Sequence, residues 1–201
     1  MGKFERKKQM AEENMSGAAS LILYLHDLVY MLAVILVVFL LLFRVVVVSG
    51  FSMYQTFTDG DYLILLSNTF YHNPRPGDVV VVSKDSFDDG APIVKRVIAT
   101  EGQTVDIDFD AGIVYVDGTA LDEPYTNTPT NLREGTEFPL VVADNCIFVM
   151  GDNRNNSKDS RSLEIGQVDR REVLGKAILL MLPGPDINTE QRDFTRIGAI
   201  R

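Results

Sequence analysis

The sequence contains no tryptophan, one cysteine and two histidines. With Cys146 alone, no disulfide can form within the chain, so a folded domain must be stabilised by its own core. Cys146 lies in the apolar run 146–150 and is interpreted as a small buried hydrophobic residue. No group of histidine, cysteine and glutamate has metal-ligand spacing, so neither a metalloenzyme nor a bound cofactor is expected.

Basic residues are also scarce, with 19 lysines and arginines against 28 aspartates and glutamates. The first 44 residues carry a net charge of +1, so residues 45–201 carry −10. A region this acidic repels nucleic-acid phosphates, and it has no basic stripe with interleaved aromatic residues. We therefore expect no nucleic-acid partner.

One uncharged hydrophobic run is present, over residues 28–43. Val45–Val48 follow Arg44 and bring the run close to the roughly 20 residues of a membrane-spanning helix. Arg44 does not exclude a span, because its aliphatic stem lets the guanidinium reach the lipid headgroups. With 201 residues, the chain has room for such an anchor and one globular domain.

Four basic residues precede the run, namely Lys3, Arg6, Lys7 and Lys8. Positive residues that flank a span favour the cytoplasmic side of the membrane. The sequence therefore predicts a single-pass protein of the cell membrane, with the lipid bilayer as a partner. Its parts are a cytoplasmic segment (residues 1–20), a transmembrane anchor (21–48) and an extracytoplasmic domain (49–201) with an irregular polar tail from about residue 184.

Two other interpretations of the hydrophobic run stay open. Val48, Ser49 and Gly50 loosely resemble the cleavage site of a removable signal peptide, although the leader is long for one. The run is also compatible with a buried core helix. A helix that is apolar on all sides needs a large protein around it, and only residues 51–201 remain to supply it.

After residue 50 the chain consists of short runs of Val, Ile, Leu and aromatic residues separated by turn residues. No long apolar period of 3.6 residues occurs there, so we predict a mainly β domain of antiparallel sheets. The expected strands cover residues 62–66, 79–82, 93–99, 104–110, 113–116, 140–142, 146–150 and 173–182. Asp117 and Gly118 predict a tight hairpin between residues 113–116 and 119–121.

Few residues have the chemistry of a nucleophile or a base. His26 lies in or beside the hydrophobic run, so a Ser-His-Asp triad would have to use His72, in a segment typical of an exposed turn. The alternative is a serine with a neutral lysine as its base. Lys95 lies in the apolar segment 92–98, where desolvation lowers the pKa of an amine. A strand lysine that faces water is the commoner arrangement.

The segment 49–56 resembles the nucleophile motif of bacterial type I signal peptidases, in which Ser-Met is followed by x-Pro-Thr. Ser52 stands in the place of the nucleophile and Met53 follows it. Gln55 replaces the usual proline, which would stiffen the turn after the nucleophile.

Three further segments occur in the order of that family, namely residues 76–81, residues 95–97 and the polar loop 151–161. The resemblance spans roughly residues 48–177. It implies an all-β catalytic domain and a membrane-bound serine endopeptidase that removes signal peptides from secreted preproteins through an acyl-enzyme. Ser52 is then the nucleophile and Lys95 the general base.

The same resemblance implies roles for neighbouring residues. The backbone N–H of Ser52 is expected to form the oxyanion site, with Gly50 in the place where some relatives carry a helping serine. Ser157 is expected to orient the amine of the lysine base. Two ion pairs are expected to support the loop, Asp159 with Arg161 and Asp152 with Arg96. These pairs are equally compatible with ordinary surface ion pairs.

A substrate could add as an extended strand beside the nucleophile. Val48, Met53, Phe57 and Val94 are our candidates for the walls of small apolar pockets, which favour the alanine-like side chains of signal-peptide cleavage sites. The alternative function is a membrane-anchored β domain that binds an envelope partner without catalysis. A self-cleaving serine/lysine protein of the repressor type is disfavoured, because it would carry a DNA-binding segment and need no membrane span.

Overall fold

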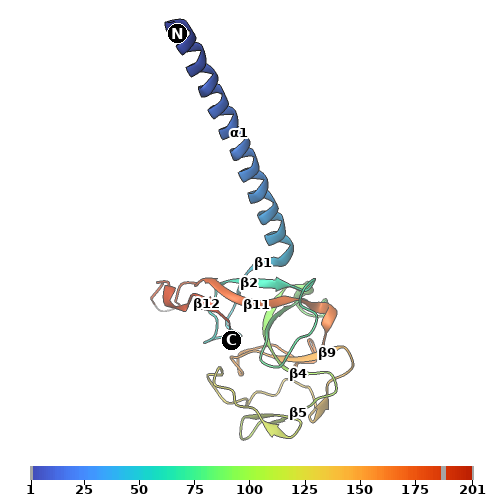
Figure 1. Ribbon diagram of the computed structural model, residues 1–201. Helices are drawn as coiled ribbons and strands as arrows, with labels where there is room; N and C mark the ends of the chain where they lie inside the picture. The colour runs from blue at the N-terminus through green and yellow to red at the C-terminus, as the bar shows by residue number, and fades with distance from the viewer. Residues whose placement is uncertain (1, 187–188, 201) are drawn as a thin grey trace. The chain divides into compact units, whose positions relative to one another are not determined.

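The structure is a computed structural model, and it describes residues 2–186 and 189–200 (Figure 1). Residues 1, 187, 188 and 201, which belong to the expected cytoplasmic segment and polar tail, lie outside the described residues. The side chains of residues 3, 4 and 7–18, with the basic residues Lys3, Lys7 and Lys8 among them, also lie outside the description. The chain divides into two compact units, Met1–Leu41 and Leu42–Arg201.

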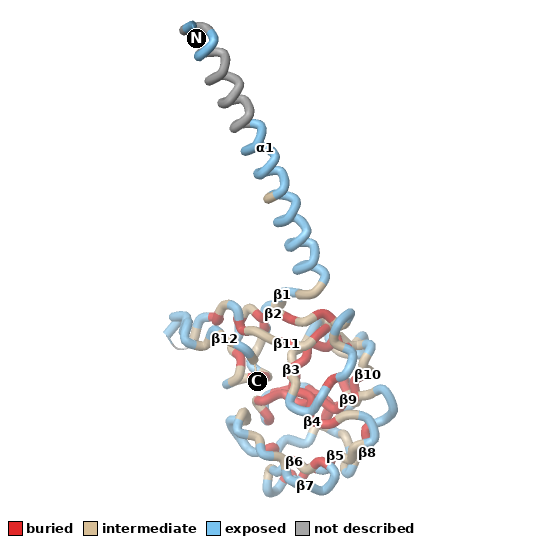
Figure 2. Tube along the Cα trace, viewed as in Figure 1, coloured by how far each residue is buried: buried red, intermediate tan, exposed pale blue. Residues whose placement is uncertain are grey.

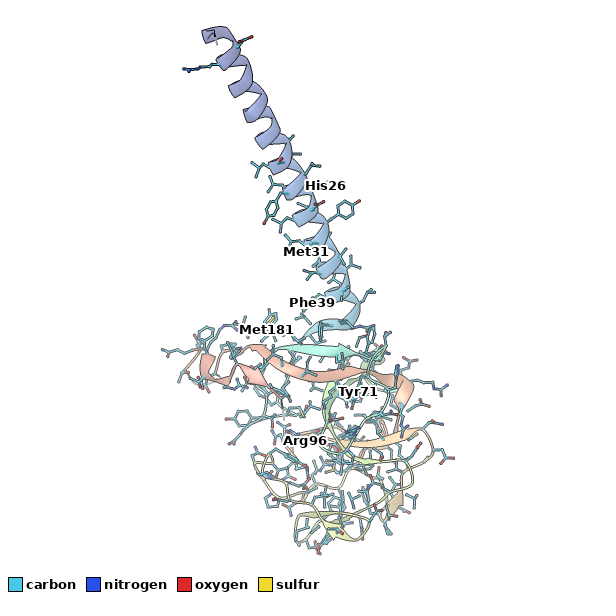
Figure 3. The ribbon with its side chains drawn as sticks, viewed as in Figure 1. His26, Met31, Phe39, Tyr71, Arg96 and Met181 are labelled. Carbon is cyan, nitrogen blue, oxygen red and sulfur yellow. The ribbon has the colours of Figure 1, made fainter. Side chains whose placement is uncertain are left out.

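The first unit is formed by one helix, α1 (Lys3–Leu42). Its segment Ala19–Leu42 spans 24 residues and is apolar enough to cross a membrane. None of this segment is buried, and Figure 3 shows His26, Met31 and Phe39 projecting from the helix. Exposure of so many apolar side chains contradicts the interpretation of the run as a core helix.

The helix ends at Leu42, before the predicted end of the anchor at Val48. Phe43–Val47 instead form strand β1, which pairs with strand β2. The physical reason is that β-branched valines favour extended backbone, and here their N–H and C=O groups find partners in a sheet. Cleavage of a leader at Gly50 would remove this strand from the sheet, which disfavours the removable signal peptide.

The second unit contains two antiparallel sheets (Figure 1). The larger has eight strands in the order β1 (Phe43–Val47), β2 (Tyr62–Ser67), β11 (Val173–Leu182), β3 (Val79–Val82), β4 (Ile93–Thr100), β9 (Cys146–Met150) and β10 (Val168–Asp169), with β12 (Gly198–Ala199) paired to β11. The smaller has the order β7 (Thr119–Ala120), β6 (Ile113–Val116), β5 (Thr104–Asp108) and β8 (Leu140–Val141). Three short 3₁₀ helices lie at η1 (Asp88–Gly90), η2 (Arg170–Glu172) and η3 (Phe194–Arg196).

The mainly β, antiparallel prediction is confirmed, and each expected strand is present with small changes at its ends. Asp117 and Gly118 both have positive φ, 51° and 76°, as a two-residue hairpin turn between β6 and β7 requires. The short strands β1, β10 and β12 were not predicted. The tail is less irregular than expected, because β12 pairs with β11 and η3 lies just before it.

The core gathers along the central strands of the larger sheet (Figure 2). One hydrophobic cluster contains Phe109 and Phe148 and lies between β4, β9 and the smaller sheet, and a second contains Met53, Phe57 and Leu65. β4 is buried over five consecutive residues rather than alternately, so both of its faces are covered. Lys95 and Arg96 lie within this buried stretch, which places two basic side chains in the middle of the domain.

Truncation of Phe148 tests the first cluster. The side chain is fully buried and contacts Phe138 edge to face with ring centroids 5.9 Å apart. We expect Phe148→Ala to lower the free energy of unfolding by about 3–5 kcal/mol, because it removes buried apolar area and leaves a cavity. Ile113→Ala on β6, where the side chain is 37 % exposed, is the control and should cost less than about 1.5 kcal/mol. Equal losses in guanidinium unfolding of the two variants would contradict this assignment of the core.

Candidate active site

Ser52 lies in the loop that connects β1 to β2. The loop is closed at its base, since Val48 N–H donates to the Asp61 carbonyl (2.8 Å) and Gly60 N–H to the Val48 carbonyl (2.9 Å). Gly50 has a φ of +83°, a conformation that suits glycine. This backbone framework holds the half-buried Ser52 at the edge of the domain core.

Lys95 reaches Ser52 from the central strand β4. Its Nζ lies 2.7 Å from Ser52 Oγ and 3.0 Å from the Val94 carbonyl oxygen. The side chain is 2 % exposed, because β4 is flanked by β3 and β9 and covered on both faces. The expectation of a buried lysine is confirmed, and the alternative of a lysine facing water is wrong.

Burial changes the proton affinity of this amine. Desolvation of the charged form lowers the pKa of Lys95 from 10.5 to about 8, against the attraction of Asp159, Asp152 and Glu134, which raise it. The neutral amine is therefore accessible near physiological pH. A neutral amine 2.7 Å from a hydroxyl can accept its proton, which is the geometry of an activated nucleophile.

Ser157 does not form the expected hydrogen bond with Lys95. Its hydroxyl donates to Asp159 Oδ2 (2.9 Å), a charged and therefore stronger acceptor than a neutral amine. Gly151 N–H donates to the same oxygen (2.9 Å). Ser157 and Asp159 therefore lie close to the Gly151 backbone, which borders the nucleophile loop, our name for residues 48–61 between β1 and β2. In this structure Ser157 therefore contacts the loop 151–161 and not the amine.

Both expected ion pairs are present, and both are buried. Arg96 Nη2 lies 2.7 Å from Asp152 Oδ2, and Arg161 Nη2 lies 2.8 Å from Asp159 Oδ2. In each pair the Nε of the arginine also donates, at 2.8 Å, to the other carboxylate oxygen. The alternative of ordinary surface ion pairs is wrong, because both carboxylates are completely shielded from solvent. Arg96, labelled in the β domain in Figure 3, is 2 % exposed.

The residues after β9 fix the nucleophile loop directly. Asn153 N–H donates to the Ser52 carbonyl, and the Asn153 side chain donates to the Phe51 carbonyl, both at 3.0 Å. Thr56 Oγ1 donates to Asp152 Oδ2 at 2.5 Å. A Cβ on Gly151 would lie 2.5 Å from the Ser52 carbonyl oxygen, so the close approach of the two loops requires glycine at this position.

The structure does not support Gly50 as a donor in the predicted oxyanion site. Gly50 N–H donates to Asp59 Oδ1 (2.8 Å), so it is not available to a substrate in this arrangement. The described residues offer no acceptor to the backbone N–H of Ser52. Among the two candidates, Ser52 therefore presents the open donor.

The candidate pocket walls lie next to Ser52 but mostly inside the core. Val48, Met53 and Phe57 are 4 %, 1 % and 2 % exposed and belong to one cluster, against which Val94 packs. Of the four, only the partly buried Val94 has substantial surface. Cys146 is half-buried beside the first core cluster, and His72 is exposed between β2 and β3.

Sequence reasoning missed a third buried ion pair. Arg154 is 0 % exposed, and its Nη2 lies 2.5 Å from Glu123 Oε1, while its Nη1 donates to Thr130 (2.9 Å). Glu134 was missed as well, and burial followed by the charge of Asp159 raises the pKa of its carboxyl. Neither acidic residue lies in a recognisable motif, so no sequence signal could have joined them to the loop 151–161.

Comparisons with known proteins point to one family. Residues 21–182 match the family described as "Signal peptidase, peptidase S26". "Probable signal peptidase I-1" of Synechocystis is 37 % identical over 140 residues, covering 66 % of this chain and 67 % of the relative. "Signal peptidase I S" of Bacillus subtilis is 31 % identical over 183 residues, covering 87 % and 96 %. A solved signal peptidase I from Enterococcus faecalis is 29 % identical, with a TM-score of 0.43, and covers 52 % of this chain and 96 % of its own.

The pKa of Lys95 predicts how the reactivity of Ser52 depends on pH. Only the neutral amine accepts a proton, so acylation of Ser52 by a serine-directed reagent should rise about tenfold per pH unit below pH 7. It should level off above about pH 8, the pKa of Lys95. Mass spectrometry of the modified residue gives the rate, and Lys95→Met should abolish the dependence. A flat profile in the wild type would contradict Lys95 as the base.

Removal of one partner tests the buried pair Arg96–Asp152. We expect Asp152→Ala to lower the free energy of unfolding by about 3–5 kcal/mol, because it leaves the Arg96 guanidinium buried without its carboxylate. The exposed pair Lys158–Glu164, with side chains 51 % and 60 % exposed, provides the control. Glu164→Ala should change stability by less than about 1 kcal/mol. Similar effects of the two substitutions would mean that burial does not distinguish the pairs.

Proposed function

Because this chain belongs to the signal peptidases of the peptidase S26 family, we propose that Ser52 and Lys95 are the nucleophile and general base with which it removes signal peptides from secreted preproteins. Family membership makes the protein a serine peptidase and a membrane enzyme. The observation that carries the dyad is the 2.7 Å contact between Lys95 Nζ, which is buried, and Ser52 Oγ.

The reaction follows from this contact. Neutral Lys95 accepts the Ser52 proton as Oγ attacks the scissile carbonyl carbon, and the oxyanion receives a hydrogen bond from the Ser52 backbone N–H. Lys95 then gives the proton to the amine of the leaving mature protein, and the signal peptide stays on Ser52 as an ester. Water attacks this acyl-enzyme with Lys95 as base, which frees the signal peptide and restores the serine.

The buried ion pairs support this reaction by holding the loop 151–161 next to the Ser52 segment. Asp152 and Asp159 lie on the loop that hydrogen-bonds the Ser52 segment, and both attract the Lys95 ammonium. Arg96 and Arg161 bind these carboxylates and leave them less free to hold the proton on Lys95. The supporting residues thus hold the loop against Ser52, while burial of Lys95 lowers its pKa to about 8.

Substrate preference and placement complete the proposal. Of the candidate wall residues, Val48, Met53 and Phe57 belong to a buried cluster, and the partly exposed Val94 packs against it, so Val94 is the one of the four that offers surface to a small apolar side chain of an extended substrate. The apolar segment Ala19–Leu42 anchors the enzyme in the lipid bilayer. The preceding basic residues favour a cytoplasmic N-terminus, which puts the domain and its substrates on the extracytoplasmic face. Nucleic acid has no part in this function.

Cleavage of a secretory preprotein by the detergent-solubilised enzyme tests the dyad. We expect Ser52→Ala and Lys95→Met each to lower kcat by about 10³-fold or more, because each removes a member of one catalytic unit. Lys158→Met on the exposed part of the loop 151–161 is the matched lysine control and should keep wild-type activity.

Circular dichroism should show that all variants are folded. A folded Lys95→Met enzyme with substantial activity would remove Lys95 as the base. A wild type that binds preprotein without cleaving it would favour the non-catalytic anchored domain instead.

A further inference from the structure

The nucleophile loop carries one buried carboxylate, which the proposed reaction does not use. Asp61, 0 % exposed, lies at the end of the loop just before β2. It accepts hydrogen bonds from Thr58 N–H (2.8 Å), Thr58 Oγ1 (3.0 Å) and Gly184 N–H (2.6 Å). A buried charge of this kind is costly unless a cation pairs with it.

The cation comes from the C-terminal segment, far away in sequence. Arg196, on η3, places Nη2 2.7 Å and Nη1 3.1 Å from the two carboxylate oxygens of Asp61. The same guanidinium donates to the Thr56 carbonyl (3.3 Å) and to Thr58 Oγ1 (3.0 Å). One side chain therefore binds the nucleophile loop at three of its residues.

A short chain of hydrogen bonds connects Arg196 to the candidate active site. Thr56, whose carbonyl accepts from Arg196, donates its hydroxyl to Asp152, and the adjacent Asn153 binds the Ser52 carbonyl. The nucleophile loop is thus held from two sides. The residues after β9 hold the Ser52 half, and the C-terminal segment holds the half from Thr56 to Asp61.

Both packing and hydrogen bonds hold this second half. Phe57 is 2 % exposed in the second hydrophobic cluster, and Ile200 of the C-terminal segment packs against that cluster. An open pocket of about 260 Å³ lies beside it, lined by Thr56, Phe57, Leu180, Arg196 and residues 198–200. At this pocket the guanidinium of Arg196 adds directed hydrogen bonds from the C-terminal segment to the loop.

We propose that Arg196 is a positioning residue of the catalytic reaction, which holds the nucleophile loop so that Ser52 Oγ stays within reach of Lys95. The 3₁₀ helix η3, which carries Arg196, is then needed for turnover and not only for the connection to β12. This inference rests on the proposed function, because it assigns Arg196 a part in the Ser52–Lys95 reaction.

The test compares two arginines of the same segment in preprotein cleavage by the full chain. Arg196→Met keeps the length of the side chain and removes all contacts with the loop. We expect kcat to fall about 10- to 100-fold, as for a nucleophile displaced by a fraction of an ångström to 1 Å, with KM within about twofold. Arg192→Met is the control, since Arg192 donates to the Pro183 carbonyl within the C-terminal segment, and its kcat should equal that of the wild type.

A conservative variant keeps the proposal testable if Arg196→Met does not fold. Arg196→Lys retains a charge for Asp61 but lacks the planar fork that reaches Thr56 and Asp61 together, so it should be folded and recover only part of kcat. All assays are run well below the unfolding temperature of each variant. A folded Arg196→Met enzyme with wild-type kcat would overturn the proposal, and if that variant does not fold, wild-type kcat in Arg196→Lys would do the same.

Wild type and Ser52→Ala are assayed alongside. If the wild type does not cleave, or Ser52→Ala does, the proposed function itself is wrong. If the wild type cleaves through Ser52 and both Arg196 variants match it, only the positioning role is lost.

Discussion

Burial of the Lys95 amine beside Ser52 is the constraint on which the rest of the domain depends. A lysine at 2 % exposure is unfavourable when charged, and this cost lowers its pKa to about 8. The sheet supplies the burial, because β4 is enclosed by β3 and β9 and covered on both faces. The same strand that stabilises the core thus lowers the proton affinity of the amine, as the base role proposed for Lys95 requires.

The charges around this amine are arranged in buried pairs. Asp152 with Arg96 and Asp159 with Arg161 exclude water from the region behind Ser52, and each arginine contacts its carboxylate through two nitrogens. Such pairs add little net stability, because desolvation offsets their attraction. Their value lies in fixed geometry, since neither can shift without leaving a buried charge unpaired. The polar loop 151–161 is held to the rest of the domain through these pairs.

Two distant segments converge on the loop that carries the nucleophile. Gly151 allows backbone contact with Ser52, and Arg196 binds Asp61 from the other end of the chain. Most of these contacts join residues more than 90 positions apart, as with Thr56 and Asp152. The loop between β1 and β2 therefore takes its shape from the complete domain rather than from its own sequence.

The sequence by itself determined the longer strands, the apolar helix and the candidates Ser52 and Lys95, because periodicity, turn residues and short motifs are local signals. It did not determine where the helix ends, since the valines of residues 45–48 suit a span and a strand equally, and only pairing with β2 decides between them. Nor did it reveal that Ser157 binds Asp159, that Glu123 joins Arg154, or that Arg196 reaches Asp61. In the sequence, each of these groups has many chemically equivalent partners. The tertiary structure decides which pair forms, because a buried charged group must be paired and the fold brings a particular partner within hydrogen-bonding distance.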